Sequence, residues 1–225
     1  SAVDKQYFEK MLSLEMSLVD LADSFVVLSR MLHAHHGVAP IIIVDEYDIP
    51  IQQGYVNDYY DEAVIFIRNL FSGGFKDNSH LSFGFMTGIL RVAQESIFSG
   101  LNNIRVNSVL EDSYSEYFGF TAEEVKKMCA YHGVLDKYEE LCEWYDGYCF
   151  GNQEIFNPWS VINYFANKCK PKAYWVFTSS NDIIGELLEN ATSDVCEHLE
   201  ELLSGKPFII PISTDVICPQ MKNNP

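Results

Sequence analysis

The run of four β-branched residues over 41–44 constrains the fold of this chain more than any other feature. Its sequence is Ile-Ile-Ile-Val, and it lies between Pro40 and the adjacent carboxylates Asp45 and Glu46. Four apolar residues are too few for a helix, and β-branched side chains favour extended backbone. Because apolar side chains occupy both faces of the run, it predicts a central strand of a parallel sheet, buried on both sides.

Helices and strands are predicted to alternate around this strand. A stripe of apolar residues predicts a helix over residues 17–36, ahead of the strand. The elements expected after it are a helix from Asp58 to Gly73-Gly74, a strand over 81–86, a helix over 92–100 and a strand over 104–110. This alternation is typical of a doubly wound α/β sheet. Residues 1–112 are therefore predicted to form part of such a core.

The pattern changes after residue 112, and residues 113–203 predict a mostly helical subdomain. Thr121 and Glu124 have the spacing of a capping box, and Asn157-Pro158 is typical of a helix start. The other expected elements are a helix over 136–147 that begins with a second capping box, a hairpin over 148–156 and a short strand over 174–177. Residues 204–225 hold four of the eight prolines and are predicted to be a linker or a truncated continuation.

Charge and composition argue against several classes of protein. The chain has 32 acidic and 15 basic residues, and its net charge of −17 disfavours direct binding to nucleic acid. No apolar run is long enough to span a bilayer, so no membrane association is expected. The six cysteines have no CxxC spacing and are expected to be free thiols, which predicts a cytoplasmic location.

Asp45 and Glu46 lie, by this prediction, at the carboxyl end of the strand over 41–44. Ligands of open α/β sheets bind beyond that end. Adjacent side chains diverge there, so one carboxylate is suited to hold Mg²⁺ and the other to polarise a water beside the γ-phosphate of ATP. Four apolar residues followed by Asp-Glu have the pattern of a Walker B motif. The alternative is that both acids are solvated loop residues.

Thr87 and Arg91 follow the next predicted strand, over 81–86. A polar side chain at that strand end commonly senses the γ-phosphate in P-loop ATPases, which makes Thr87 the candidate sensor. Arg91 either stabilises phosphate charge or pairs with an acid on the surface.

Several blocks of sequence carry a broader resemblance. They are IIIVDEYDIPI, FIRNLF, FMTGILRVAQESIFSGLNN, SVLEDSYSEYFGFTAEEV, EWYDGYCFGNQEIFNPWSVINYF and YWVFTSSNDII, and they extend from residue 41 to about residue 190. Together they resemble the AAA-ATPase-like family of bacterial and archaeal proteins. The resemblance implies a P-loop ATPase of the AAA/STAND type that uses ATP and Mg²⁺. It implies that Asp45 is the magnesium-side Walker B acid, Glu46 the catalytic carboxylate and Thr87 the sensor.

The same resemblance has implications beyond the site. The part after residue 112 corresponds to a helical, winged-helix-like lid, and many members carry a C-terminal nuclease-like domain of the PD-(D/E)XK kind. The sequence departs from the family in one respect, because no GxxxxGK[ST] phosphate loop occurs in its 225 residues. We therefore expect an internal fragment that starts after the phosphate loop of a partial P-loop fold.

Two functions remain open at this point. The first is part of a nucleotide-dependent switch, in which ATP binding and slow hydrolysis move the lid relative to the core. The second is a non-enzymatic module derived from an ATPase, whose acidic surface and lid bind a protein partner or another copy of the chain. A third class, a metal nuclease within this segment, lacks an Asp/Glu-x-Lys element after a predicted strand.

Other candidate sites each have a simpler interpretation. His33, His35 and His36 suggest a metal site, but they fit the end of a helix better. The aromatic stretch over 144–148 is either a binding platform or core packing, and packing is the favoured interpretation. Residues 179–182 are predicted to cap the start of a helix, and the N-terminus of a helix can also bind an anion. The cysteines have no histidine partner in a recognisable arrangement, so a cysteine nucleophile is not expected.

The missing phosphate loop leads to the first testable prediction. We expect the 225-residue chain to bind Mg-ATP weakly or not at all, because it lacks the lysine and the backbone N–H groups that hold phosphates. Calorimetric titration of the chain with Mg-ATP measures this directly. Micromolar binding would contradict the prediction.

Overall fold

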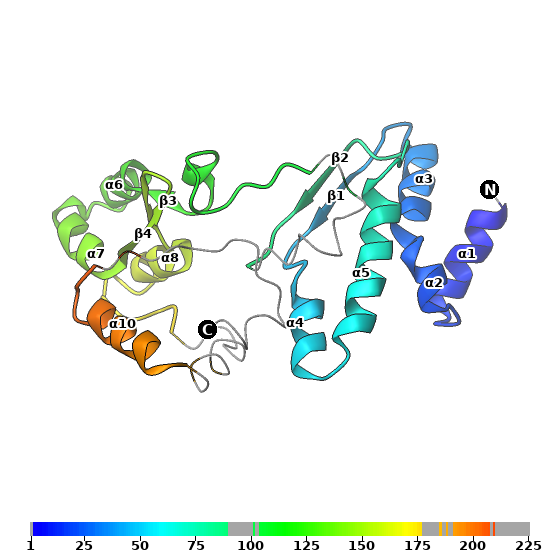
Figure 1. Ribbon diagram of the computed structural model, residues 1–225. Helices are drawn as coiled ribbons and strands as arrows, with labels where there is room; N and C mark the ends of the chain where they lie inside the picture. The colour runs from blue at the N-terminus through cyan, green and yellow to red at the C-terminus, as the bar shows by residue number, and fades with distance from the viewer. Residues whose placement is uncertain are drawn as a thin grey trace. The chain divides into compact units, whose positions relative to one another are not determined.

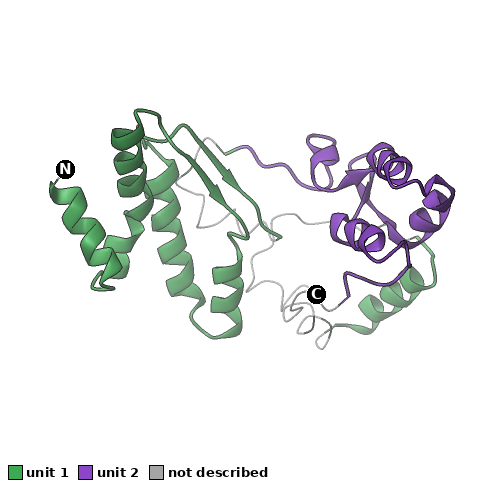
Figure 2. Ribbon diagram, turned by 180° about the vertical axis from the view of Figure 1, so that it is seen from behind, with its two compact units in different colours: residues 1–104, 181–225 green, residues 105–180 purple. Residues whose placement is uncertain are grey.

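The computed structural model describes residues 2–89, 101, 104–176, 185, 188, 191–207 and 209. The chain divides into two compact units (Figure 2). Unit 1 comprises residues 1–104 and 181–225, and unit 2 comprises residues 105–180. Division into a core over 1–112, a lid over 113–203 and a linker over 204–225 stays a prediction.

Unit 1 is an α/β unit with one small parallel sheet (Figure 1). Its elements are α1 (Ala2–Leu12), α2 (Leu18–Ala22), α3 (Ser24–His36), β1 (Ile41–Val44), α4 (Ile49–Val56), α5 (Tyr60–Phe75), β2 (Phe83–Met86) and α10 (Ser193–Leu203). The predicted strands over 41–44 and 81–86 are thus present, the second as its last four residues. β1 pairs with β2 in parallel, with Ile41 opposite Phe83 and Val44 opposite Met86.

The core of unit 1 is formed by α5 with its neighbours. Its buried members are Ile51, Val64, Ile67, Phe71 and Leu101. Phe25 of α3 stacks parallel to Phe71 of α5, with ring centroids 6.5 Å apart. A side chain at Gly84 of β2 would lie 2.5 Å from the ring of Phe75, so the glycine lets the end of α5 approach the strand.

One face of the two-stranded sheet is exposed, which corrects the prediction that the first strand is buried on both sides. Ile41 and Ile43 are 60% and 71% exposed, and Phe83 of β2 is 60% exposed. Ile42 and Val44 are half-buried and face the other way. Figures 1 and 2 show α3 and α5 on one side of the sheet, and an apolar run cannot indicate which of its two faces the helices cover.

Two predicted helices differ from the observed ones. The helix expected over 17–36 is two helices, because Ser17 and Asp20 form a capping box at the start of α2 and a new helix begins after Asp23. The helix expected from Asp58 to Gly73-Gly74 begins at Tyr60 and continues to Phe75. Gly74 lies inside this helix, where its lack of a side chain leaves room for Phe25, which a Cβ atom at that position would meet at 2.8 Å.

The strand predicted over 104–110 is absent, and those residues have irregular backbone. Ser108 accounts for the difference, since its side chain accepts from Leu110 N–H and its carbonyl accepts from Glu111 N–H, which makes a turn. Residues 174–176 form no strand either, and Tyr174 O accepts from the Trp159 indole instead. The predicted helix over 92–100 lies outside the described residues.

Unit 2 has a three-stranded antiparallel sheet in the order β3-β5-β4, with helices around it. Its elements are β3 (Phe120–Thr121), α6 (Ala122–Tyr131), α7 (Tyr138–Tyr145), β4 (Asp146–Phe150), β5 (Gln153–Phe156), α8 (Pro158–Ala166) and two short 3₁₀ helices, Ser115–Tyr117 and Leu135–Lys137. The fully buried core residues are Val125, Cys129, Leu141, Val161 and Tyr164.

Local sequence signals in unit 2 are largely confirmed. Thr121 and Glu124 form the predicted capping box, and Asn157 caps α8 by accepting from Ser160 N–H. The hairpin is β4 and β5. The second predicted capping box is wrong, because α7 begins at Tyr138 without a side-chain cap. Among the described residues, no helix is both long and apolar enough to cross a membrane.

Candidate functional site

The parallel pairing of β1 and β2 brings the two chain segments that follow them together. Thr87 N–H donates to Val44 O at 2.9 Å, and Tyr47 N–H donates to Thr87 O at 2.9 Å. These bonds extend the ladder beyond the last strand residues. The loop over 45–48 and residues 87–89 therefore lie side by side at the carboxyl end of the sheet.

Asp45 and Thr87, predicted from separate strand ends, are in direct contact. The Thr87 hydroxyl donates to Asp45 Oδ1 in a short hydrogen bond. Glu46 N–H donates to the same carboxylate oxygen at 3.1 Å and lies 3.4 Å from Thr87 Oγ1. The orientation of the Asp45 carboxylate is thus set by one side-chain hydroxyl and one backbone amide.

Glu46 has a different environment from Asp45. Its backbone is in the left-handed region, with φ of +51°, a conformation that residues other than glycine rarely adopt. This conformation turns the chain out of the strand while the amide stays on Asp45. Both residues are exposed, but the Asp45 carboxylate is held by hydrogen bonds from Thr87 and from Glu46 N–H.

Asp48 is a third acid of this loop, and its role was not predicted from the sequence. Asp48 is fully buried. Its Oδ2 accepts hydrogen bonds from Gln52 Nε2 at 2.6 Å and from Ile89 N–H at 3.2 Å. It thereby joins the loop after β1 to the segment after β2. The available signal was its position directly before Ile49-Pro50, where a helix begins.

Gly88 allows the two segments to approach this closely. A Cβ atom at Gly88 would lie 2.6 Å from Asp48 Oδ1 and 2.6 Å from the ring of Tyr47. The ring of Tyr47 packs in turn against Phe71 of the core, with centroids 6.3 Å apart. The loop is therefore packed on a rigid helix and is held from the other side by residues 88 and 89.

The oxygen atoms at this edge fit a magnesium ion that keeps part of its water shell. The Asp45 carboxylate and the Thr87 hydroxyl are hard oxygen donors at one point, and Mg²⁺ is commonly held by one or two carboxylates together with waters and substrate phosphates. Among the described residues, no group of three or more His, Cys, Asp or Glu side chains forms a complete metal cage. The fit is thus to a metal that substrate phosphates and waters would also hold, not to a cage built by the described residues alone.

Other candidate residues do not join this site. Arg91 and the cluster over 179–182 lie outside the described residues. His33 Nδ1 lies 3.3 Å from His80 Nδ1, whereas His35 and His36 pack on each other. The predicted histidine group is therefore split between two contacts.

The described cysteines are free thiols, as predicted. Burial raises the pKa of both the Cys129 and the Cys142 thiol above the ordinary value for cysteine. Neighbouring thiols add to the rise at Cys129, and neighbouring carboxylates add to it at Cys142. A raised pKa lowers the thiolate fraction, so neither side chain has the character of a nucleophile.

The sequence matches a known family over the part of the chain that carries this site. Residues 2–98 match the family described as predicted AAA-ATPase, and this range includes Asp45, Glu46 and Thr87. This part of the chain belongs to the AAA-ATPase-like family. The family match agrees with the resemblance noted in the sequence, which began at residue 41. The match also covers helices α1–α3, which precede β1.

A relative of this chain is described as an uncharacterized protein in the vnfD 5′ region of Azotobacter chroococcum mcd 1. The two are 31% identical over 166 residues, which cover 73% of this chain and 32% of the relative. The matched segment thus spans about a third of the length of that relative. No solved structure matches the chain.

The different roles of Asp48 and Asp45 can be tested by measuring how much each contributes to the free energy of unfolding. We expect Asp48→Ala to lower the free energy of unfolding of unit 1 by about 1–3 kcal/mol, because Gln52 Nε2 and Ile89 N–H lose a buried acceptor. Asp45→Ala is the matched control, and we expect a loss below about 1 kcal/mol because Asp45 is exposed. Urea unfolding followed by far-UV circular dichroism gives both values. Equal losses for the two variants would contradict the assignment of Asp48 as the structural acid.

Proposed function

We propose that Asp45, Glu46 and Thr87 form the Walker B and sensor side of an ATP site in an AAA-type ATPase. The observation that carries the proposal is the contact between the Asp45 carboxylate and the Thr87 hydroxyl at adjoining strand ends. The family match over residues 2–98 supports it.

The roles proposed for these side chains follow from their contacts and exposure. Asp45, oriented by the Thr87 hydroxyl and by Glu46 N–H, holds Mg²⁺ directly or through water. Bound Mg²⁺ offsets charge on the phosphates of ATP. Glu46, exposed and turned away by its left-handed backbone, accepts a proton from the attacking water or orients it. Thr87 detects the γ-phosphate, and Arg91 stabilises phosphate charge.

The exposed sheet face supports a further layer of structure over that face in the whole protein, as in a doubly wound fold. All-parallel sheets occur almost only with both faces covered by other structure. Here Ile41, Ile43 and Phe83 are exposed on one face. We propose that β1 and β2 are two strands of a doubly wound P-loop sheet, and that the residues that cradle the phosphates lie outside this 225-residue chain.

Unit 2 is proposed as the lid of the same ATPase. Helices α6–α8 together with a small antiparallel sheet are the kinds of element expected in a winged-helix-like subdomain over residues 113–203. In this proposal ATP binding and slow hydrolysis change the position of the lid, so the whole protein acts as a nucleotide-dependent switch. Fusion to a nuclease-like domain and a cytoplasmic location stay predictions.

A second candidate function is a non-enzymatic interaction module derived from an ATPase. The exposed apolar face of the β1–β2 sheet and the net charge of −17 favour binding to another protein. Under this alternative Asp45 and Glu46 are retained parts of an old site and take no part in catalysis.

Glu46→Gln distinguishes the two functions in a longer polypeptide that contains both this chain and a phosphate loop. If Glu46 handles the attacking water, ATP hydrolysis is expected to fall by about a hundredfold or more while ATP binding is retained. Phosphate release and equilibrium binding of a fluorescent ATP analogue measure the two quantities.

Glu62→Gln is the matched control for this experiment. Glu62 is an exposed acid in the first turn of α5, and its replacement is expected to leave both quantities unchanged. Equal hydrolysis by Glu46→Gln, Glu62→Gln and the unmodified protein would rule out the proposed role of Glu46 and favour the interaction module.

A further inference from the structure

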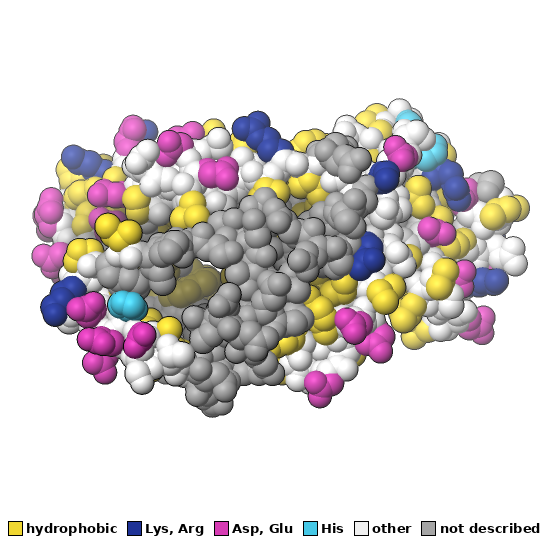
Figure 3. All heavy atoms as spheres, viewed as in Figure 1, with side chains coloured by type: hydrophobic (Ala, Val, Ile, Leu, Met, Phe, Trp, Pro, Cys, Tyr) yellow, Lys and Arg dark blue, Asp and Glu magenta, His cyan; other side chains and the backbone are white. Residues whose placement is uncertain are grey.

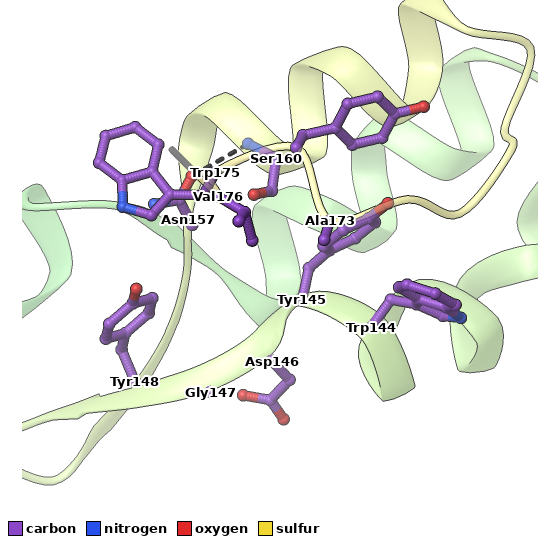
Figure 4. Close-up of a pocket in the computed structure, with 11 residues that line it drawn as sticks. Trp144, Tyr145, Asp146, Gly147, Tyr148, Asn157, Ser160, Ala173, Trp175 and Val176 are labelled. Atoms are coloured by element: carbon purple, nitrogen blue, oxygen red, sulfur yellow. Dashed lines mark hydrogen bonds between the residues drawn. The ribbon is translucent and has the colours of Figure 1, made fainter. Parts of the chain in front are cut away.

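An open pocket of about 370 Å³ lies entirely within unit 2 (Figure 4). It is formed by the end of α7, the start of β4, the start of α8 and residues 173–176. The lining residues that matter for its chemistry are Trp144, Asp146, Tyr148, Ser160, Tyr174 and Trp175. This site is separate in sequence from Asp45 and Thr87, so it does not rest on the proposed ATPase function.

Three of the aromatic side chains at the pocket are about half exposed. Trp144 is 51% exposed, Trp175 is 49% exposed and Tyr148 is 44% exposed. Tyr145, from the same sequence stretch, is buried and packs against Tyr164 in the core. Core packing, the interpretation favoured from the sequence, thus holds for Tyr145 but not for its aromatic neighbours on either side.

The backbone over residues 172–174, where the lining segment 173–176 begins, is held in place by two sets of hydrogen bonds. The Tyr145 hydroxyl donates to Lys172 O and accepts from Lys172 N–H, both at 3.0 Å. Trp159 Nε1–H donates to Tyr174 O at 3.2 Å. Because the backbone beside the pocket is anchored to both α7 and α8, the aromatic rings are presented by an ordered framework.

Asp146 is the one carboxylate among the lining residues, and no lysine or arginine lines the described pocket. Figure 4 shows it between Trp144 and Tyr148, with Trp175 on the same side as Tyr148. Aromatic faces attract cations, and the attraction adds to that of a nearby carboxylate. A guanidinium group also stacks flat on aromatic rings and donates hydrogen bonds in its plane, which a lysine ammonium cannot match.

The charge of unit 2 agrees with a cationic partner. Residues 105–180 hold 11 acidic and 7 basic residues, and acidic and basic side chains are scattered among hydrophobic ones on the face of the molecule in Figure 3. Exposed tryptophan and tyrosine side chains around a pocket are typical of protein interfaces, where they surround an anchoring residue. We propose that this pocket binds an arginine side chain of a partner protein.

Peptide binding to the 225-residue chain tests this proposal. The probes are acetyl-Gly-Arg-Gly-amide, the same peptide with citrulline in place of arginine, and free guanidinium ion. The indole N–H resonances of Trp144 and Trp175 are expected to shift saturably with the arginine peptide. Citrulline has the same shape without the charge, so its peptide is expected to bind at least about threefold more weakly.

Two pairs of variants locate the binding. Asp146→Asn and Tyr148→Ala are each expected to weaken binding of the arginine peptide about two- to fivefold. Their controls are Glu143→Gln, an exposed acid on α7, and Tyr131→Ala, an exposed tyrosine on α6; neither lines the pocket, and neither is expected to change the affinity. Far-UV circular dichroism shows whether each variant is folded.

Three results would overturn the proposal. The first is equal affinity for the arginine and citrulline peptides, which requires no variant and therefore does not depend on their folding. The second is equal weakening by each variant and its control. The third is tighter binding of guanidinium ion than of the peptide, which would assign the pocket to a small organic cation instead of a protein partner.

Discussion

Parallel pairing places Val44, the last residue of β1, opposite Met86, the last residue of β2. The segments that follow the two strands therefore start side by side at the carboxyl end of the sheet. The contact between Asp45 and Thr87 depends on this register, because a slip of one residue would exchange the two faces of a strand. Gly84 supports the register, since the ring of Phe75 occupies the space that any other side chain at that position would need. The position of the site therefore depends on the register of the β1–β2 pair, and Gly84 leaves room beside that pair for Phe75 of α5.

The three acids of the loop after β1 divide into a structural one and two available for chemistry. Asp48 is buried and joins the loop to Ile89, whereas Asp45 and Glu46 are exposed. A buried carboxylate requires hydrogen-bond donors, and Asp48 receives them from the helix that follows it and from the neighbouring loop. This arrangement supports the proposed use of Asp45 and Glu46, because Asp48 joins the two segments through hydrogen bonds in which neither of them takes part.

The sequence predicted that Asp45 and Thr87 each lie at the carboxyl end of a strand, because both follow apolar runs, and the structure adds the contact between them. It predicted the Thr121–Glu124 and Asn157 caps because capping is a local interaction of nearby residues. It missed the burial of Asp48 and the exposure of Ile41, Ile43 and Trp144, since these depend on which face other elements cover. The strand expected over 104–110 failed for a local reason, the turn formed around Ser108.

We propose that Asp45 and Thr87 together form an oxygen site for a divalent cation. Mn²⁺ prefers the same oxygen ligands as Mg²⁺ and broadens the NMR signals of nearby nuclei, so its binding can be mapped residue by residue. We predict that low concentrations of Mn²⁺ broaden the amide resonances of Asp45, Glu46 and Thr87 first, that Asp45→Asn removes this effect, and that Asp61→Asn, an exposed acid on α5, retains it. Broadening that is strongest elsewhere, or that persists in Asp45→Asn, would contradict the account.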